Sequence, residues 1–313
     1  MKFLKNFMIL NRKKLITHDG SFHADDVFAC AILCILLKKM GQRFKIIRTR
    51  DEELIKKGDY IFDIGGVYDP EKNRFDHHQK GGAGKHDGVG VEYSSFGLVW
   101  KKFGEELTGS SSVAKRVDEH LVQPIDAIDN GINICTPVIS GVFPYDISFI
   151  VSMFNPSFKN IDSDHYNEFI KILPFAKNIL LNEIEKSKDQ EYIEKYISSV
   201  VEKKDKDSKI LILDEYIPRV EINIQVVNYK DILFVLVPAN KKLESWKLLA
   251  VPNSINSFEN RKNLPQTWAG LKDKELQDIT GVPDATFCHR GLFLAGAKTK
   301  EGAIKLAQIA LES

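Results

Sequence analysis

The chain has 313 residues, enough for about two domains of roughly 100–200 residues each. Hydrophobic residues make up 43% and charged residues 28%, a balance that excludes an intrinsically disordered chain. The formal net charge is +1, so an anionic substrate would have to be held by a local patch or by metal ions.

Targeting and redox features favour a cytoplasmic protein. The basic, apolar segment 1–14 lacks a small-residue cleavage site, which argues against a signal peptide and leaves a mitochondrial presequence open. The longest apolar stretch, Val27–Leu37, is shorter than the roughly 20 residues that cross a bilayer, so no membrane partner is expected. No cysteine belongs to a C-x-x-C pair, and free thiols in a reducing compartment are predicted.

The first part of the chain alternates between two periodicities. Strands are predicted at 13–18, 44–49 and 60–64, with helices at 24–40 and 51–57 between them. This alternation is typical of an α/β fold with a parallel sheet. The sequence therefore predicts a parallel-sheet N-terminal domain.

Helical patterns follow at 94–107, 112–128 and 163–203, with Pro174 as a kink or boundary. The Gly-rich stretch 80–90 lacks the preceding strand and the G-K-[ST] ending of a P-loop, so that interpretation is rejected.

The charged run 202–209 predicts a solvated linker, and the composition changes after it. Further strands are expected at 210–213, 220–226, 232–238, 247–251 and around 293, with a helix at 300–311. We therefore predict a domain at 1–205 and a smaller α+β domain at 206–313.

Three clusters of histidine and aspartate stand out in the first domain. They are T-H-D-G-S-F-H-A-D-D at 17–26, D-I-G-G at 63–66 and D-H-H at 76–78. His18 and Asp63 end predicted parallel strands, whose carboxyl ends share one edge of a sheet. The neighbouring loops would bring His23, Asp25 and the D-H-H histidines to that edge.

Imidazole and carboxylate ligands together suit Mn, Fe or Zn, while oxygen-rich shells suit Mg. Two cations could clamp the attacking water and the leaving oxygen of an in-line displacement, with Asp63 shared between them. Any single residue could instead be structural, and Asp25 could be a helix cap. The whole set is hard to explain in that way, because buried carboxylates without a cation are costly.

The ordered motifs resemble the melanocyte-proliferating-gene family of the DHH phosphoesterase superfamily. The matches include H-x4-H-x-D-D, D-I-G-G-V-Y-D-P, R-F-D-H-H-Q, I-D-A-I-D-N-G and G-A-K-T-K-E-G-A, from about Lys14 to the last helix. The resemblance implies a DHH-like metal-binding catalytic domain followed by a substrate-binding domain.

The resemblance also implies roles for single residues. The metal ligands would be His18, His23, Asp25, Asp63, His77 and Asp129. Asp129 matches the motif better than Asp126, and a turn role for it stays open. Asp63, His77 and His78 would form the catalytic set, with His78 facing the substrate phosphate.

Members of this family are described as RNA exonucleases that work from the 3′ end. The implied activity is hydrolysis of phosphodiester bonds in RNA or short oligonucleotides with two divalent ions, Mn first and Mg or Zn as alternatives. Ala295-Gly296-Ala297 replaces the usual G-G-H or G-G-N, which leaves a pyrophosphatase or small-nucleotide hydrolase open. A non-catalytic, metal-stabilised nucleotide-binding module is the third hypothesis, and a homodimer is a further option.

Basic residues outside the clusters are candidates for substrate binding. They are Arg48, Arg50, His289, Arg290 and Lys298. Each has a structural alternative: an ion pair for the two early arginines, a surface turn for His289 and Arg290, and a surface lysine for Lys298. Trp268 could stack on a base, although packing in a core is the more common use of a tryptophan.

Overall fold

The computed structural model describes residues 12–160, 164–242, 244–255, 257 and 259–313, so most of the segment considered as a targeting sequence lies outside the described residues. The chain divides into two compact units, Met1–Lys188 and Asp189–Ser313. The division falls within helix α7 (His165–Lys203), which accommodates Pro174 in its interior. The predicted division at 205 and 206 lies just past this helix and remains a proposal.

The first unit contains a five-stranded sheet in the order β2-β1-β3-β5-β4. The strands are β1 (Lys13–Thr17), β2 (Phe44–Arg48), β3 (Tyr60–Phe62), β4 (Tyr68–Asp69) and β5 (Arg74–Phe75). All neighbours pair in parallel except β4 and β5, which are antiparallel. The prediction of a parallel sheet is therefore confirmed.

The strand register sets the position of the first two polar clusters. Ile16 pairs with Ile61, and Phe62 pairs with Phe75. The residues that follow in register, His18, Asp63 and Asp76, consequently leave the sheet along the same edge.

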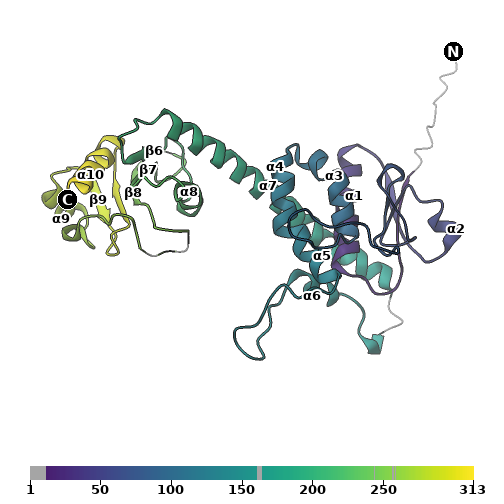
Figure 1. The fold of residues 1–313 in the computed structure, drawn as a ribbon. Coiled ribbons are helices and arrows are strands. Elements are labelled where there is room, and N and C mark those ends of the chain that lie inside the picture. Colours follow the sequence, from purple (N-terminus) through teal and green to yellow (C-terminus); the bar gives the residue numbers. More distant parts are fainter. Residues whose placement is uncertain (1–11, 161–163, 243, 256, 258) are drawn as a thin grey trace, which may run out of the picture. The chain divides into compact units, whose positions relative to one another are not determined.

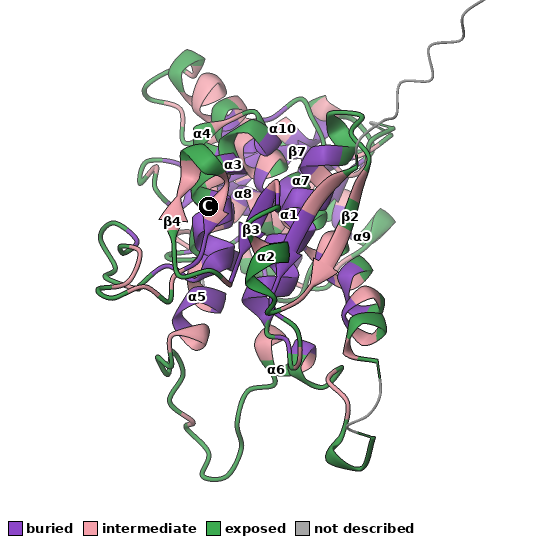
Figure 2. Cartoon of the chain, turned by 90° about the vertical axis from the view of Figure 1, so that its right-hand side faces the viewer, coloured by how far each residue is buried: buried purple, intermediate pink, exposed green. Residues whose placement is uncertain are grey.

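Helix α1 (Ala24–Lys39) is buried along nearly its whole length and forms the centre of the first core, where Figure 2 colours it as buried. Acidic residues occupy its first turn and lysines its last, which complements the helix dipole. It packs against β1, β3 and α3 (Ser95–Thr108), with the Phe28 and Phe96 rings 5.2 Å apart between centroids.

The remaining elements of the first unit are short. They are α2 (Glu52–Ile55), η1 (Pro70–Lys72), α4 (Ser111–Val117), the π-helix η2 (Asp118–Val122), α5 (Gln123–Asp129), α6 (Ile147–Ser152) and η3 (Phe158–Asn160). The predicted helix 112–128 is thus a continuous helical run interrupted by one π turn. Helix α6 was not predicted, although Asp146 caps it and Ile147, Ile150 and Val151 follow a helical spacing.

The second unit is built on a mainly antiparallel sheet in the order β6-β7-β8-β10-β9. Its strands are β6 (Ile210–Ile212), β7 (Phe234–Pro238), β8 (Trp246–Ala250), β9 (Ala285–Cys288) and β10 (Leu294–Ala297). Only β6 and β7 among these pair in parallel. Its helices are α8 (Arg219–Val226), η4 (Gln266–Trp268), α9 (Asp273–Thr280) and α10 (Lys300–Glu312). This arrangement confirms an α+β second part.

One element prediction in the second unit is wrong. The stretch 220–226 was expected to be a strand because apolar and polar residues alternate along it, but it forms helix α8. Pro218 stands at the N-cap, and Ile222 and Val226 are both buried, as expected for residues four apart on one helix face. Trp268 is buried in the core of this unit, which agrees with the packing use favoured for it over base stacking.

Within the described residues, no helix is both long enough and apolar enough to cross a bilayer.

Candidate metal centre

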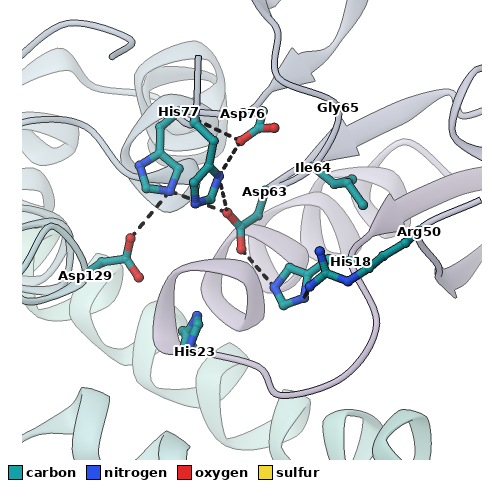
Figure 3. A pocket seen from close by; sticks show the side chains of 10 residues that line it. His18, His23, Arg50, Asp63, Ile64, Gly65, Asp76, His77 and Asp129 are labelled. Carbon is teal, nitrogen blue, oxygen red and sulfur yellow. Dashed lines mark hydrogen bonds and ion pairs between the residues drawn. The ribbon is translucent and has the colours of Figure 1, made fainter. Parts of the chain in front are cut away.

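Asp63 lies at the middle of the polar edge of the first sheet. One of its carboxylate oxygens is 3.1 Å from Nε2 of His18, and the other is 3.5 Å from both Nε2 of His77 and Nδ1 of His78. Its side chain is only 3% exposed. Figure 3 shows this carboxylate between His18 on one side and His77 on the other. The three polar clusters of the sequence therefore meet at Asp63. This is the edge of the sheet where the carboxyl ends of the parallel strands were expected to bring them.

The backbone of Asp63 adopts the left-handed region with φ 53°, which is uncommon for a residue with a side chain. Its N–H donates to the carbonyl of Phe75 at 3.2 Å, and Gly65 and Gly66 continue the turn with positive φ. The turn is stabilised by Asp76, whose carboxylate accepts from the N–H of Gly66. This local geometry turns the Asp63 side chain along the edge of the sheet.

The charge state of this cluster follows from burial and close partners. Burial would raise the pKa of Asp63, but its interactions with His18 and His77 outweigh burial and hold the pKa well below the usual range. Burial lowers the pKa of His18, whereas the bond to Asp63 and the charge of Asp26 raise it, with a net rise. An ionised Asp63 therefore lies among the imidazoles of His18, His77 and His78.

The start of α1 supplies a second set of ligand atoms. His23 occupies the N-cap, and its N–H donates to Asp26 at 3.0 Å, so the cap role considered for Asp25 belongs to Asp26. Both carboxylate oxygens of Asp25 are buried and accept no hydrogen bond from the described residues. Burial, followed by the charges of Asp63 and Asp129, raises the pKa of Asp25 well above its usual value. A carboxylate in such a position fits a site built for a cation.

Asp129, at the end of α5, completes the centre. Its carboxylate lies 3.5 Å from Nε2 of His77. Asp126, the alternative from the same motif, is fully buried elsewhere and bonds to Nε2 of His86 at 2.7 Å. The structure thus places Asp129, and not Asp126, among the potential ligands.

The potential metal ligands form three groups of three residues. Within each group, the ligand atoms lie within 4.8 Å of one another. The groups are His18, His23 and Asp63; Asp63, His77 and His78; and His23, Asp25 and Asp129. All six predicted ligands are included, and Asp63 and His23 each belong to two groups. The donor set of imidazole and carboxylate fits a divalent cation of the Mn, Fe or Zn type.

The ligand groups open into a cavity of about 420 Å³. It is lined by His18, His23, Arg50, Asp63, Ile64, Gly65, Asp76, His77, His78 and Asp129. A smaller cavity of about 190 Å³ shares His23 and Asp129 with it and is otherwise lined by Ala24, Ile128, Ser148 and Ser152. A small ligand can therefore reach the centre from solvent.

His78 differs from His18 and His77 because its side chain is 63% exposed at the cavity, whereas theirs are 8% and 10% exposed. Asp76 accepts hydrogen bonds from its ring Nδ1 at 2.8 Å and from its backbone N–H at 3.1 Å. These two bonds orient the ring. Asp76 was not predicted as a functional residue, although it is the first letter of the D-H-H motif.

The two early arginines have different surroundings. Arg50 lines the cavity with a side chain that is 67% exposed, and one guanidinium nitrogen lies 3.4 Å from Nδ1 of His18. Arg48 is 2% exposed, donates to the carbonyl of Gly20 at 3.0 Å and lies 3.7 Å from Asp26. Arg48 does not line the cavity, and its surroundings favour the structural alternative over the phosphate contact.

The candidate substrate-binding residues of the second unit do not form one cluster. His289 and Arg290 lie in the exposed turn between β9 and β10, where His289 Nδ1 accepts from the N–H of Gly291. Lys298 follows the other end of β10, and its N–H donates to the carbonyl of Asp284. Because β9 and β10 are antiparallel, the turn and Lys298 lie at opposite ends of a hairpin.

A buried network beside the centre escaped prediction. His86 from the Gly-rich stretch lies between Asp126 at 2.7 Å and Asp118 at 3.2 Å. Asp126 also accepts from the Ser94 hydroxyl at 2.6 Å and from the N–H of Gly97 at 3.1 Å. The only sequence signal was a polar residue, Asp126, in an otherwise apolar helix face.

Comparison with known proteins places the chain in one group. Residues 14–311 match a family model for MYG1 exonucleases, described as an uncharacterised protein family, UPF0160. The MYG1 protein of Caenorhabditis elegans is 32% identical, covering 95% of this chain and 94% of the relative. The human MYG1 exonuclease is 27% identical, covering 94% of this chain and 85% of the relative.

Solved structures resemble the chain less closely. RecJ from Thermus thermophilus in complex with Mn²⁺ aligns with 96% of this chain and 52% of its own, with 13% identity and a TM-score of 0.29.

Proposed function

Because the chain belongs to the MYG1 exonuclease family, UPF0160, we propose that it is a metal-dependent hydrolase of phosphoester bonds. The most specific form of this proposal is a 3′–5′ exonuclease acting on RNA or short oligonucleotides in the cytoplasm. The observation that carries it is the convergence of three ligand groups through Asp63 and His23 at one open cavity.

The proposed metal ligands are His18, His23, Asp25, Asp63, His77 and Asp129. Two divalent cations, with Mn²⁺ as the first choice and Mg²⁺ or Zn²⁺ as alternatives, are supported by the overlap of the three groups, because Asp63 and His23 are available to more than one ion. When bound, such cations lower the pKa of water and neutralise charge on a phosphoryl group.

The remaining residues at the cavity hold and orient the substrate. Nδ1 of His78 is bonded to Asp76, so its other ring nitrogen, Nε2, is the atom we assign to a phosphate oxygen. The exposed guanidinium of Arg50 provides positive charge at the rim, where a flexible phosphate can reach it. Asp76 acts by holding His78, and it needs no direct contact with the substrate.

The second candidate function is hydrolysis of pyrophosphate or a small nucleotide at the same site. It is favoured by the charge of the cavity, since Arg50 is the one lysine or arginine among the lining residues. A long polyanion would need further cations, for which His289, Arg290 and Lys298 of the second unit remain proposed contacts. A binding module without catalysis is the least supported alternative, because every proposed ligand is present at the site.

The test combines metal analysis with a substrate panel. Asp63→Asn is expected to lose most bound manganese and most hydrolysis of a 5′-labelled RNA oligomer, because the shared carboxylate becomes a neutral amide. Asp87→Asn, at an exposed position in the Gly-rich stretch, is the matched control and should keep both. Full activity of Asp63→Asn would contradict the proposed centre, whereas a clear preference for pyrophosphate over RNA would favour the second candidate.

A further inference from the structure

The connection between α5 and α6, together with α6 and the residues after it, exposes an unusual amount of apolar surface. We call residues 132–158 the apolar arm. Val138 is 100% exposed, Phe158 82% and Phe143 74%. In Figure 1 the connection forms a long loop that extends away from the helices of the first unit, and Figure 2 colours most of it as exposed.

The concentration of these side chains is not typical of the rest of the chain. Of the 22 exposed large hydrophobic residues in the described chain, 11 lie in the apolar arm. They are Ile132, Ile134, Val138, Ile139, Val142, Phe143, Tyr145, Phe149, Met153, Phe154 and Phe158. Single exposed hydrophobic residues are ordinary, but so many along one segment of the chain are typical of a region that a partner covers.

The base of the apolar arm is firmly attached to the first unit. The Asn155 side chain accepts from the N–H of Phe22 at 2.9 Å and donates to the carbonyl of the same residue at 2.8 Å. Val151 is fully buried in the first core, and Asp146 caps α6 by accepting from the N–H of Phe149. The part of the arm from Asp146 to Asn155 is therefore held against the first unit.

The charge of the apolar arm restricts the kind of partner. Residues 132–158 contain one charged side chain, Asp146, and no lysine or arginine. A nucleic-acid strand is disfavoured, because phosphate contacts require cations. A strongly charged protein surface is also disfavoured, because the arm would bury its charges without pairing them.

The size of the exposed surface corresponds to a dimer interface. Aromatic side chains bury about 150–250 Å² each, so the eleven exposed side chains offer on the order of 1,000 Å². A standard interface removes about 800 Å² from each partner. In a two-fold dimer the same patch faces itself, and a nearly uncharged patch does so without repulsion between like charges. We propose that the apolar arm is the interface through which two copies of this chain associate.

The oligomeric state of the full chain tests this proposal. Sedimentation velocity should be measured at protein concentrations from about 0.1 to 100 µM, the range in which interfaces of this size commonly dissociate. The sedimentation coefficient should rise with concentration to that of a dimer. The double variant Val138→Ser and Phe143→Ser should be monomeric over the same range. The matched control, Val220→Ser and Ile279→Ser, changes equally exposed residues of the second unit and should remain dimeric.

Cys135 provides a second measurement inside the apolar arm. It is exposed, whereas Cys30, Cys34 and Cys288 are buried, so a nitroxide label can be attached to Cys135 selectively. The labelled protein should show dipolar coupling between two spins, and the coupling should vanish in the Val138→Ser and Phe143→Ser variant. A monomeric chain without coupling overturns the proposal. If that chain also loses RNA affinity in the variant, the arm binds bases instead.

Discussion

Nε2 of His18 lies 3.1 Å from a carboxylate oxygen of Asp63, although 44 residues of chain separate the two. Both residues follow parallel strands that pair directly, so the sheet register brings them together. The contact means that the centre depends on the alignment of β1 and β3 as much as on the ligands themselves.

Asp25→Asn should separate metal binding from stability. Without metal, the variant should be more stable than the wild type by about 1–3 kcal/mol, because a buried carboxylate that accepts no hydrogen bond becomes neutral. Addition of Mn²⁺ should stabilise it less than the wild type, since one ligand is weakened. Thermal unfolding with EDTA and with Mn²⁺ measures both effects. Lower stability of the variant in EDTA would show that Asp25 has a structural partner.

His78→Gln should lower kcat by about 10²–10³-fold if its ring contacts the substrate phosphate. Bound metal and thermal stability should change little, because the side chain is largely exposed. Steady-state kinetics on a dinucleotide, together with metal analysis, check this prediction. If the variant instead loses metal, His78 is a ligand and its assignment to the substrate is wrong.

The two early arginines form a matched pair. Arg50→Met should raise KM about tenfold with little change in stability, because it removes an exposed charge at the rim. Arg48→Met should lower the free energy of unfolding by about 3 kcal/mol and leave KM nearly unchanged, because Asp26 loses a buried partner. Kinetics and urea unfolding of both variants distinguish the roles. Equal effects on KM would return Arg48 to the substrate site.

His86 should make stability depend on pH. Burial lowers its pKa, but the bonds to Asp118 and Asp126 raise it from 6.5 to about 9. The folded state therefore binds the proton more tightly than the unfolded state, so the stabilisation is complete below pH 6.5 and is lost as the pH rises through about 9. The free energy of unfolding of the wild type should fall across this range.

The variant His86→Gln should be less stable by about 3 kcal/mol below pH 6.5 and should lack most of this pH dependence, because Asp126 is left without its charged partner. His120→Gln, at an exposed position, is the control and should follow the wild-type profile. A profile of His86→Gln parallel to that of the wild type would exclude the His86 pair as the cause.

The positions of site residues could be predicted from the sequence where these residues follow parallel strands. His18 and Asp63 could be placed together because parallel strands end at one edge. The D-H-H histidines were expected there on a neighbouring loop, and the structure adds that the short strand β5, which was not predicted, joins the same sheet just before them. The His86–Asp126 contact could not be found in this way, because it joins a loop to a helix 40 residues later. Such contacts depend on how helices and loops pack in the folded chain, and the spacing of hydrophobic residues along the sequence does not reveal this packing.

Other differences have equally local causes. The segment 220–226 satisfies both a strand period and a helix face, and the proline at 218 favours the helix start. Arg48 ends β2 and Arg50 follows two residues later, yet Arg48 is enclosed by Phe22 and Phe169 while Arg50 faces the cavity. The exposure of the apolar arm could not be predicted, because its hydrophobic residues resemble those of a buried segment. Only the folded structure shows which of them reach the surface.

The left-handed backbone at position 63 restricts which amino acids natural variation or protein engineering can place there. Aspartate, asparagine and glycine adopt this conformation far more readily than branched or bulky residues. Exchange for glutamate would therefore alter the path of the chain as well as the length of the acid. Asparagine preserves the path and removes only the charge, which makes it the informative replacement at this position.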